Sequence, residues 1–203
     1  MRPASASAAD GLVHVLVCGG TPHEWGAMSG ADWGDRFAEI ARGVGCVGAR
    51  WVTVMPHHSS PGADADLGRM ASVFGAMDKV EQVPAHASAR FLWRRDDGLG
   101  IVVDPHADGH SRFATVVESM RVSGETVTEE ALSAALLDPV GSEPDLALIL
   151  GRPDTLPTSP VWELAYSELV FLDIEWSALQ ASHLEMAIDD FNRRHRRFGG
   201  LDS

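Results

Sequence analysis

Residues 145–169 read DLALILGRPDTLPTSPVWELAYSEL, and the beginning of this stretch decides the class of fold. Five apolar residues, Leu146–Leu150, follow Asp145 without interruption and end at Gly151. An unbroken apolar run of this length is typical of an inner strand of a parallel sheet, which is covered on both faces. The run therefore predicts a parallel sheet with helices packed on its two sides.

On both sides of this run, segments of strand length alternate with segments of helical spacing. Expected strands cover residues 13–18, 50–55, 98–103, 146–150 and 170–172. Expected helices cover residues 32–45, 63–80, 111–122, 128–137 and 177–198. This alternation predicts an α/β fold with a mostly parallel central sheet flanked by helices. We expect one domain over residues 11–203, preceded by a disordered N-terminus at residues 1–10.

Helix ends and faces can also be predicted from single residues. Thr128 is the expected N-cap of its helix, and Ser177 with Gln180 forms an expected capping box. The helical spacing over residues 111–122 predicts that Phe113 faces the core. After the first strand, residues 19–22 are expected to form a loop.

The composition limits the class of protein. The chain has 203 residues, 45% of them hydrophobic and 22% charged, which suits one globular domain. Its net charge of −13 argues against a nucleic-acid partner, because such a partner needs a basic surface. Two cysteines, Cys18 and Cys46, are too few for a disulfide scaffold, and no stretch reaches the about 20 apolar residues of a membrane span. We therefore expect a cytoplasmic protein.

The stretch 145–169 resembles, without a gap, a signature of the cis-prenyltransferases, the family of undecaprenyl diphosphate synthase. Family members typically read DLLIRTSGE, then a short Arg-Leu-Ser-Asn stretch, then WQLAYSEL. The resemblance continues through FLDIEW at 171–176 to RRFGG at 196–200, and a weaker match covers GETVTEE at 124–130. It extends over residues 13–200 and implies the fold of this family.

Several positions that carry chemistry in the family hold other residues here. The family's first strand ends in Asp-Gly-Asn, whose Asp binds the magnesium diphosphate of the allylic substrate. This chain has Gly19 and Thr21 at the Asp and Asn positions. Ala31 stands where the family has a His, and MPHHSSP at 55–61 shares little with the family's Phe-Ser-x-Glu-Asn-Trp passage.

The arginines that grip the second diphosphate are also replaced. The first of them aligns with Ile149, and a second Arg and a Ser align with Thr155 and Pro157. Magnesium needs carboxylate oxygens near the phosphates, and arginines clamp a diphosphate by paired, charge-assisted hydrogen bonds. Because both kinds of group are missing together, the resemblance implies a chain without catalytic residues of its own.

Other family positions are kept. Glu168 matches a Glu that helps to hold the metal, and Trp162 and Tyr166 match positions around the dimer surface, where we place them four apart on a helix. Arg197-Phe198-Gly199, preceded by Arg196, matches the family's terminal R-x-G, which reaches across the dimer to the diphosphate of the neighbouring site. The Nogo-B receptor-type subunit of eukaryotic cis-prenyltransferases shows a similar split between lost and kept residues.

The resemblance therefore implies a non-catalytic subunit of a heteromeric cis-prenyltransferase. Its partner is a catalytic chain that binds most of the magnesium, and its ligands are prenyl diphosphates. Arg196, Arg197 and Gly199 complete the partner's isopentenyl diphosphate site, while Trp162, Tyr166 and Glu168 lie at the interface. We also expect that the lipid product allows the protein to associate peripherally with a membrane.

Other interpretations stay open. The first is a diverged stand-alone prenyl-diphosphate transferase or cyclase, which would use Arg152, Asp154, Glu168 and the adjacent histidines His57 and His58. Those histidines, if in a strand, point to opposite faces. A homodimeric scaffold or prenyl-lipid binder is the second.

Some single features also have purely structural explanations that need no ligand. Residues 104–110 include His106 and His110 and are a candidate metal cluster. We favour the alternative that they form a hydrophilic turn. The arginines of residues 193–197 also suit the negative end of a helix dipole without any ligand.

Overall fold

A computed structural model describes residues 12–86 and 89–198, with Cys46 and residues 195–198 described by their backbone alone. The strands of the described chain are β1 (His14–Cys18), β2 (Trp51–Met55), β3 (Val80–Val83), β4 (Arg90–Arg94), β5 (Gly100–Val103), β6 (Leu146–Leu150) and β7 (Glu168–Leu172). Its α-helices are α1 (Pro22–Ala27), α2 (Gly30–Val44), α3 (Ala63–Gly75), α4 (Gly109–Ser123), α5 (Glu129–Leu137) and α6 (Ala181–Phe198). Short 3-10 helices are η1 (Gly45–Val47), η2 (Glu163–Ala165) and η3 (Trp176–Ala178).

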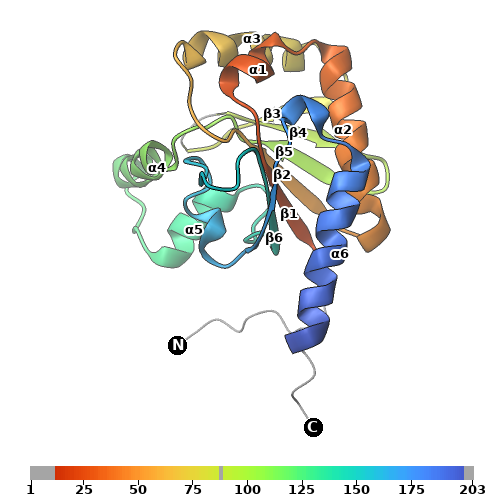
Figure 1. Ribbon diagram of the computed structural model, residues 1–203. Coiled ribbons are helices and arrows are strands. Elements are labelled where there is room, and N and C mark those ends of the chain that lie inside the picture. Colours follow the sequence, from red (N-terminus) through yellow and green to blue (C-terminus); the bar gives the residue numbers. More distant parts are fainter. Residues whose placement is uncertain (1–11, 87–88, 199–203) are drawn as a thin grey trace.

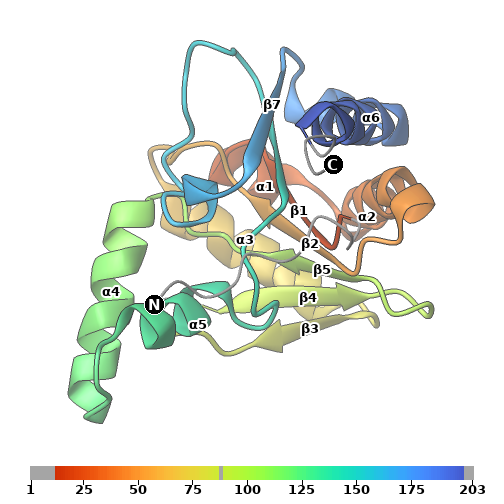
Figure 2. The same ribbon diagram turned by 90° about the horizontal axis from the view of Figure 1, so that it is seen from below.

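The strands form one sheet in the order β3-β4-β5-β2-β1-β6-β7. β5, β2, β1, β6 and β7 are parallel neighbours, and β3 and β4 add an antiparallel edge. Helices cover both faces: Figure 1 shows α2 and α6 on one side and α4 and α5 on the other, and Figure 2 shows the same layers from below. The predicted α/β class with a mostly parallel sheet is confirmed.

The antiparallel edge was not predicted. The sequence favours a helix through residue 80, but α3 ends at Gly75 and β3 begins at Val80. The end residues of β3 are half-buried and its middle ones, Glu81 and Gln82, are exposed, so it lacks the apolar run that marks the inner strands. An edge strand is stabilised by pairing with its neighbour, here β4, rather than by its own burial.

Two other element boundaries differ from expectation. Residues 22–27 form the short helix α1, which Thr21 caps by accepting a hydrogen bond from the Glu24 backbone. The last α-helix begins at Ala181 rather than at Ser177, because residues 176–178 form η3. At its start, the Gln180 backbone donates to His183 Nδ1 over 3.1 Å, so the expected Ser177–Gln180 capping box is wrong. The Thr128 N-cap is confirmed, since its side chain accepts from the Ala131 backbone.

Aromatic side chains fill the space between the sheet and helices α1, α2 and α3. Trp25, Trp33, Phe37 and Phe74 have no exposed surface. Trp33 lies 5.6 Å from Trp25, 4.8 Å from Phe74 and 6.1 Å from Trp176, measured between ring centroids. Aromatic rings contribute the largest buried areas of any side chains, so this cluster is the centre of the core on that face.

The opposite face of the inner strands carries a smaller apolar cluster, which includes Leu16, Cys18, Met55 and Ile149. Cys18 is fully buried, and burial raises the pKa of its thiol to about 12. Among the described helices, none is both long and apolar enough to cross a bilayer.

The burial of Cys18 gives a direct test of this core. At pH 8 a thiol with a pKa near 12 is about one part in ten thousand thiolate. We expect iodoacetamide to modify Cys18 at least a hundredfold more slowly in the native protein than in urea, measured by peptide mass spectrometry. Equal rates in the two conditions would contradict the buried position.

Candidate functional site

The carboxyl ends of the parallel strands are where α/β sheets bind ligands. In this chain that edge is formed by Gly19 and Gly20 after β1, His57 after β2, Asp104 after β5 and the loop from Gly151 after β6. Backbone hydrogen bonds tie these segments together: His57 N–H donates to the Gly20 carbonyl over 2.8 Å, and Thr158 N–H donates to the His57 carbonyl over 2.9 Å. The turn after β1, the bend after β2 and the loop after β6 are therefore held together by backbone hydrogen bonds.

The turn after β1 is packed against apolar side chains. A Cβ atom at Gly19 would lie 2.7 Å from Leu150 Cδ1, and one at Gly20 would lie 2.7 Å from Trp25 Nε1. Gly20 also has φ +73°, a backbone conformation that favours glycine. No carboxylate belongs to this turn, and the space into which one would project is filled. The turn therefore does not fit a magnesium diphosphate.

The other replaced positions lie in different surroundings. Ile149 in β6 is fully buried in the cluster with Leu16 and Met55, so an arginine there would meet apolar side chains. Ala31 lies exposed in the first turn of α2, and Pro61 lies exposed before α3. Of these three, only Ile149 is enclosed by the core.

The two adjacent histidines meet each other rather than facing apart. They follow β2 in a bend, and their Nδ1 atoms are 3.3 Å apart, so the expectation of opposite faces is wrong. His57 is buried and His58 is exposed. Burial, and then the neighbouring His58, lower the pKa of His57 and favour its neutral form.

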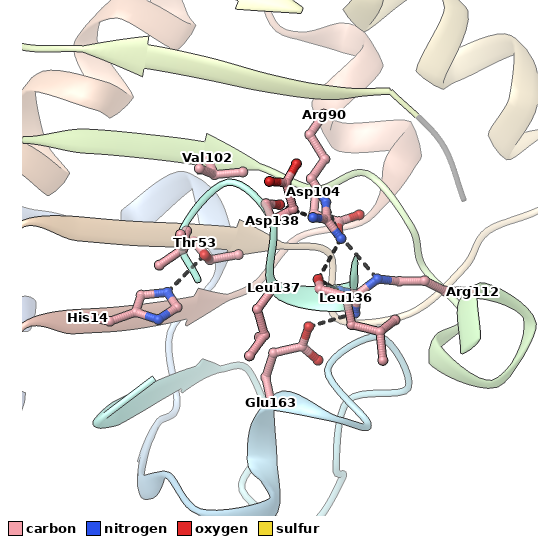
Figure 3. Close-up of a pocket in the computed structure, with 11 residues that line it drawn as sticks. His14, Thr53, Arg90, Val102, Asp104, Arg112, Leu136, Leu137, Asp138 and Glu163 are labelled. Carbon is pink, nitrogen blue, oxygen red and sulfur yellow. Dashed lines mark hydrogen bonds and ion pairs between the residues drawn. The ribbon is translucent and has the colours of Figure 1, made fainter. Parts of the chain in front are cut away.

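A buried ionic cluster lies beside this edge, and Figure 3 shows its members converging from four elements. Asp104 Oδ2 accepts from Arg90 Nε over 2.9 Å and lies 3.3 Å from Arg112 Nε. Arg112 also donates to Glu163 Oε1 over 2.6 Å. Both arginines donate to the Leu136 carbonyl at the end of α5. We call Arg90, Asp104, Arg112 and Glu163 the ionic cluster.

The charges of this cluster compensate one another among side chains that are almost completely buried. Burial pushes the pKa of Asp104 up, but Arg112 and Arg90 outweigh burial and hold it below its usual value. Burial raises the pKa of Glu163, and Arg112 opposes this shift. A cavity of about 10 Å³ adjoins the cluster, which is room for one water molecule and no more. The cluster is therefore structural and does not form a substrate site.

The sequence predicts a hydrophilic turn, or alternatively a metal cluster, around Asp104 and His106. Asp104 instead belongs to the ionic cluster, and Asp108 caps α4 by accepting from the backbone of His110 and Ser111. In the part of the chain that the structure describes, no three His, Cys, Asp or Glu side chains lie close enough to hold a metal ion.

The residues assigned to the interface lie at the end of the β6–β7 connection. Tyr166 is 77% exposed, and Trp162 is half-buried and stacks on Phe113 at 5.9 Å. Trp162 and Tyr166 flank the three-residue η2, so the longer helix expected for them is wrong. Phe113, expected to face the core, is 38% exposed, because the core positions of α4 are taken by Val116 and Met120.

Glu168 begins β7 and pairs in register with Leu146, at the amino-terminal edge of the sheet. Gly19 follows the carboxyl end of β1, so the two positions lie at opposite edges of the same sheet. Of the tail residues, Arg196 and Arg197 are described by their backbone in α6 only, and Gly199 lies outside the described residues.

Sequences and solved structures that are similar to this chain come from the cis-prenyltransferases. Residues 106–199 match the family model described as "Putative undecaprenyl diphosphate synthase". An isoprenyl transferase from Bacillus cereus is 36% identical over 138 residues, which cover 64% of this chain and 54% of that protein. Isoprenyl transferase 2 of Bradyrhizobium diazoefficiens is 39% identical over 95 residues, which cover 47% and 38%. The chain thus spans about half the length, or less, of these curated relatives.

The fold comparison reaches further along the chain. A crystal structure of a probable undecaprenyl diphosphate synthase from Campylobacter jejuni superposes with a TM-score of 0.58 at 15% identity, covering 93% of this chain and 98% of that one. The fold is that of the cis-prenyltransferases. The family model covers residues 106–199, and the sequence matches are to proteins named isoprenyl transferase.

The ionic cluster gives a first prediction for this region. Removing the Asp104 charge leaves two buried arginines short of a partner, so we expect Asp104→Asn to lower the free energy of unfolding by about 3–5 kcal/mol. Urea denaturation at pH 7 measures this loss. The matched control is Glu118→Gln, which removes the same charge from an exposed pair with Arg121 and should leave the midpoint almost unchanged.

The pH dependence of this loss is set by the lowered pKa of Asp104. An acid whose pKa is lowered on folding stabilises the protein fully above its unfolded value of about 4, and this stabilisation declines as the pH falls. The difference between wild type and Asp104→Asn should therefore shrink below about pH 4. A difference that stays constant down to pH 3 would contradict the assignment.

The packed turn gives a second prediction. Restoring the family's carboxylate by Gly19→Asp forces a Cβ against Leu150, so we expect a stability loss of about 1–3 kcal/mol and no turnover of prenyl diphosphates with magnesium. Thermal unfolding and a product assay measure the two effects. Adding Leu150→Ala should relieve the contact at Gly19 without creating activity, since Ile149 still occupies the arginine position. Turnover by Gly19→Asp alone would show that the turn is not obstructed.

Proposed function

We propose that this chain is a non-catalytic subunit of a heteromeric cis-prenyltransferase in the cytoplasm. It pairs with a catalytic chain of the same family, and its C-terminal Arg197 and Gly199, with Arg196, complete the partner's isopentenyl diphosphate site. The partner chain binds the magnesium and the allylic diphosphate. The complex elongates an allylic diphosphate with cis geometry.

The observation that carries this proposal is the packed turn at Gly19. Leu150 and Trp25 occupy the space that a side chain at Gly19 or Gly20 would need, and Ile149 is enclosed by the core. A chain that served its own diphosphate site would need charged groups at these positions. Their replacement by close apolar packing favours a subunit that acts at another chain's site.

The surface around η2 suits a protein partner. Val161 is 45% exposed and Tyr166 77% exposed, next to the stacked pair of Phe113 and Trp162. Aromatic side chains such as Tyr166 and Trp162 are enriched at the centres of protein interfaces. The Arg112–Glu163 ion pair holds η2 on α4, so these side chains belong to one rigid surface.

The direction of α6 also favours action on a neighbour. The helix starts near the carboxyl edge of the sheet, runs beside α2 and extends past the opposite edge, as Figure 1 shows. Its far end therefore points away from the chain's own packed turn.

Co-expression with a catalytic cis-prenyltransferase from the same genome tests the proposal. We expect a complex on size-exclusion chromatography and an activity that neither chain has alone. Arg197→Ala should lower kcat/KM for isopentenyl diphosphate about tenfold to a hundredfold, the effect of one charge-assisted hydrogen bond, and leave the complex intact. Arg193→Ala is the matched control on the same helix, because Arg193 pairs with Asp190.

Three results would contradict the proposal. The first is the absence of a complex, and the second is an Arg197→Ala variant that behaves like wild type. The third is turnover of prenyl diphosphates by the pure chain, which would favour the stand-alone enzyme.

A further inference from the structure

The connection that leads into α6 and the first residue of this helix, together residues 176–181, are here called the root of α6. Charged side chains of α2 bind this root, and these contacts belong neither to the candidate site nor to the apolar core. Arg36 donates from Nη1 to the Leu179 carbonyl over 2.5 Å and from Nη2 to the Ser177 carbonyl over 3.2 Å. Its guanidinium lies 4.7 Å from the centroid of the Trp176 ring. One side chain of α2 thus holds three residues of the connection that leads into α6.

Glu39, one turn further along α2, binds the first residue of α6. Its Oε2 accepts from the Ala181 backbone N–H over 2.8 Å, and its Oε1 accepts from Arg42 over 2.7 Å. The first N–H groups of a helix have no partner within the helix, and a carboxylate at this end also suits the helix dipole. Glu39 therefore caps α6 from a neighbouring element.

Gly43 lets the two helices approach closely at the same place. A Cβ atom there would lie 2.7 Å from Leu184 Cβ and 2.8 Å from the Ala181 carbonyl oxygen. Any other residue would push the start of α6 outward. The contact, the cap and the arginine together fix both the position and the direction of the root of α6.

A fixed root matters because α6 is long. Residue 197 lies sixteen residues beyond Ala181, or about 24 Å along the axis at 1.5 Å per residue. A tilt of about 5° at the root would move that end by about 2 Å on this geometry. Misplacement of a binding group by about 1 Å can cost a hundredfold in rate.

We propose that Arg36 and Glu39 are positioning residues that set where the C-terminal tail enters the neighbouring subunit's diphosphate site. This inference rests on the proposed function and adds to it which residues of this chain determine the tail's reach. Neither residue touches substrate, so both act through the direction of α6. Their loss should therefore weaken use of isopentenyl diphosphate without weakening the complex itself.

The test uses the complete complex with its catalytic partner. We expect Arg36→Met and Glu39→Ala each to lower kcat/KM for isopentenyl diphosphate at least tenfold, with the KM of the allylic substrate and the dissociation constant of the complex unchanged. Glu39→Gln should retain most of the activity, because its amide oxygen still accepts from Ala181 N–H. Arg94→Met is the matched control, since Arg94 also lies over a tryptophan, 5.5 Å from the Trp51 ring centroid, but on β4.

A double-mutant cycle separates positioning from a general loss of structure. In an Arg197→Ala background, Arg36→Met should cost little more, because the tail it positions no longer has its binding group. A full, additive loss in that background would overturn the inference. If Arg36→Met lowers the thermal midpoint enough to perturb folding, the Glu39→Ala and Glu39→Gln pair, on a partly exposed side chain, carries the test.

The outcomes separate the positioning role of Arg36 and Glu39 from the proposed function as a non-catalytic subunit. If Arg197→Ala costs activity and the α2 variants do not, the positioning role alone is wrong. If Arg197→Ala is silent or no complex forms, the proposed function fails and the positioning role fails with it.

Discussion

The buried ion pairs that Arg112 makes with Asp104 and Glu163 join segments far apart in the sequence, since Arg112 and Glu163 are 51 residues apart. Asp104 directly follows β5, Arg112 belongs to α4, and Glu163 lies in η2, in the connection between β6 and β7. Because all these side chains are buried, each charge is tolerated only while its partners stay in place. The sheet edge, α4, the end of α5 and the surface around η2 are therefore fixed relative to one another by one set of ion pairs and hydrogen bonds.

The inner sheet follows directly from residue type. Runs such as Leu146–Leu150 are fully apolar because both faces of an inner parallel strand are covered, so composition alone marks them. β3 carries no such mark, because its middle residues Glu81 and Gln82 are exposed and it is stabilised by pairing with β4 rather than by apolar burial. The start of α6 was misplaced for a similar reason, because Glu39 of a distant helix caps it.

In the candidate site too, some features can be predicted from the sequence and others depend on the fold. The absence of a carboxylate at Gly19 can be predicted from sequence, but its close contact with Leu150 cannot, because that contact depends on how β1 and β6 lie side by side. The ionic cluster also escaped prediction: Arg90 and Arg112 look like surface residues until the fold encloses them. The one signal in the sequence is that Asp104 directly follows the apolar run of β5.

The packing at Gly19 also bears on how such a chain can change over evolutionary time. An aspartate at that position meets Leu150, and a smaller residue at 150 first opens a void in the core. An arginine at 149 has to enter an enclosed apolar cluster. Each single step back towards a diphosphate site is thus destabilising before any of them is useful. In the heteromeric enzyme that we propose, this apolar packing would make the division of labour hard to reverse, because selection on folding alone would keep the chain dependent on its partner.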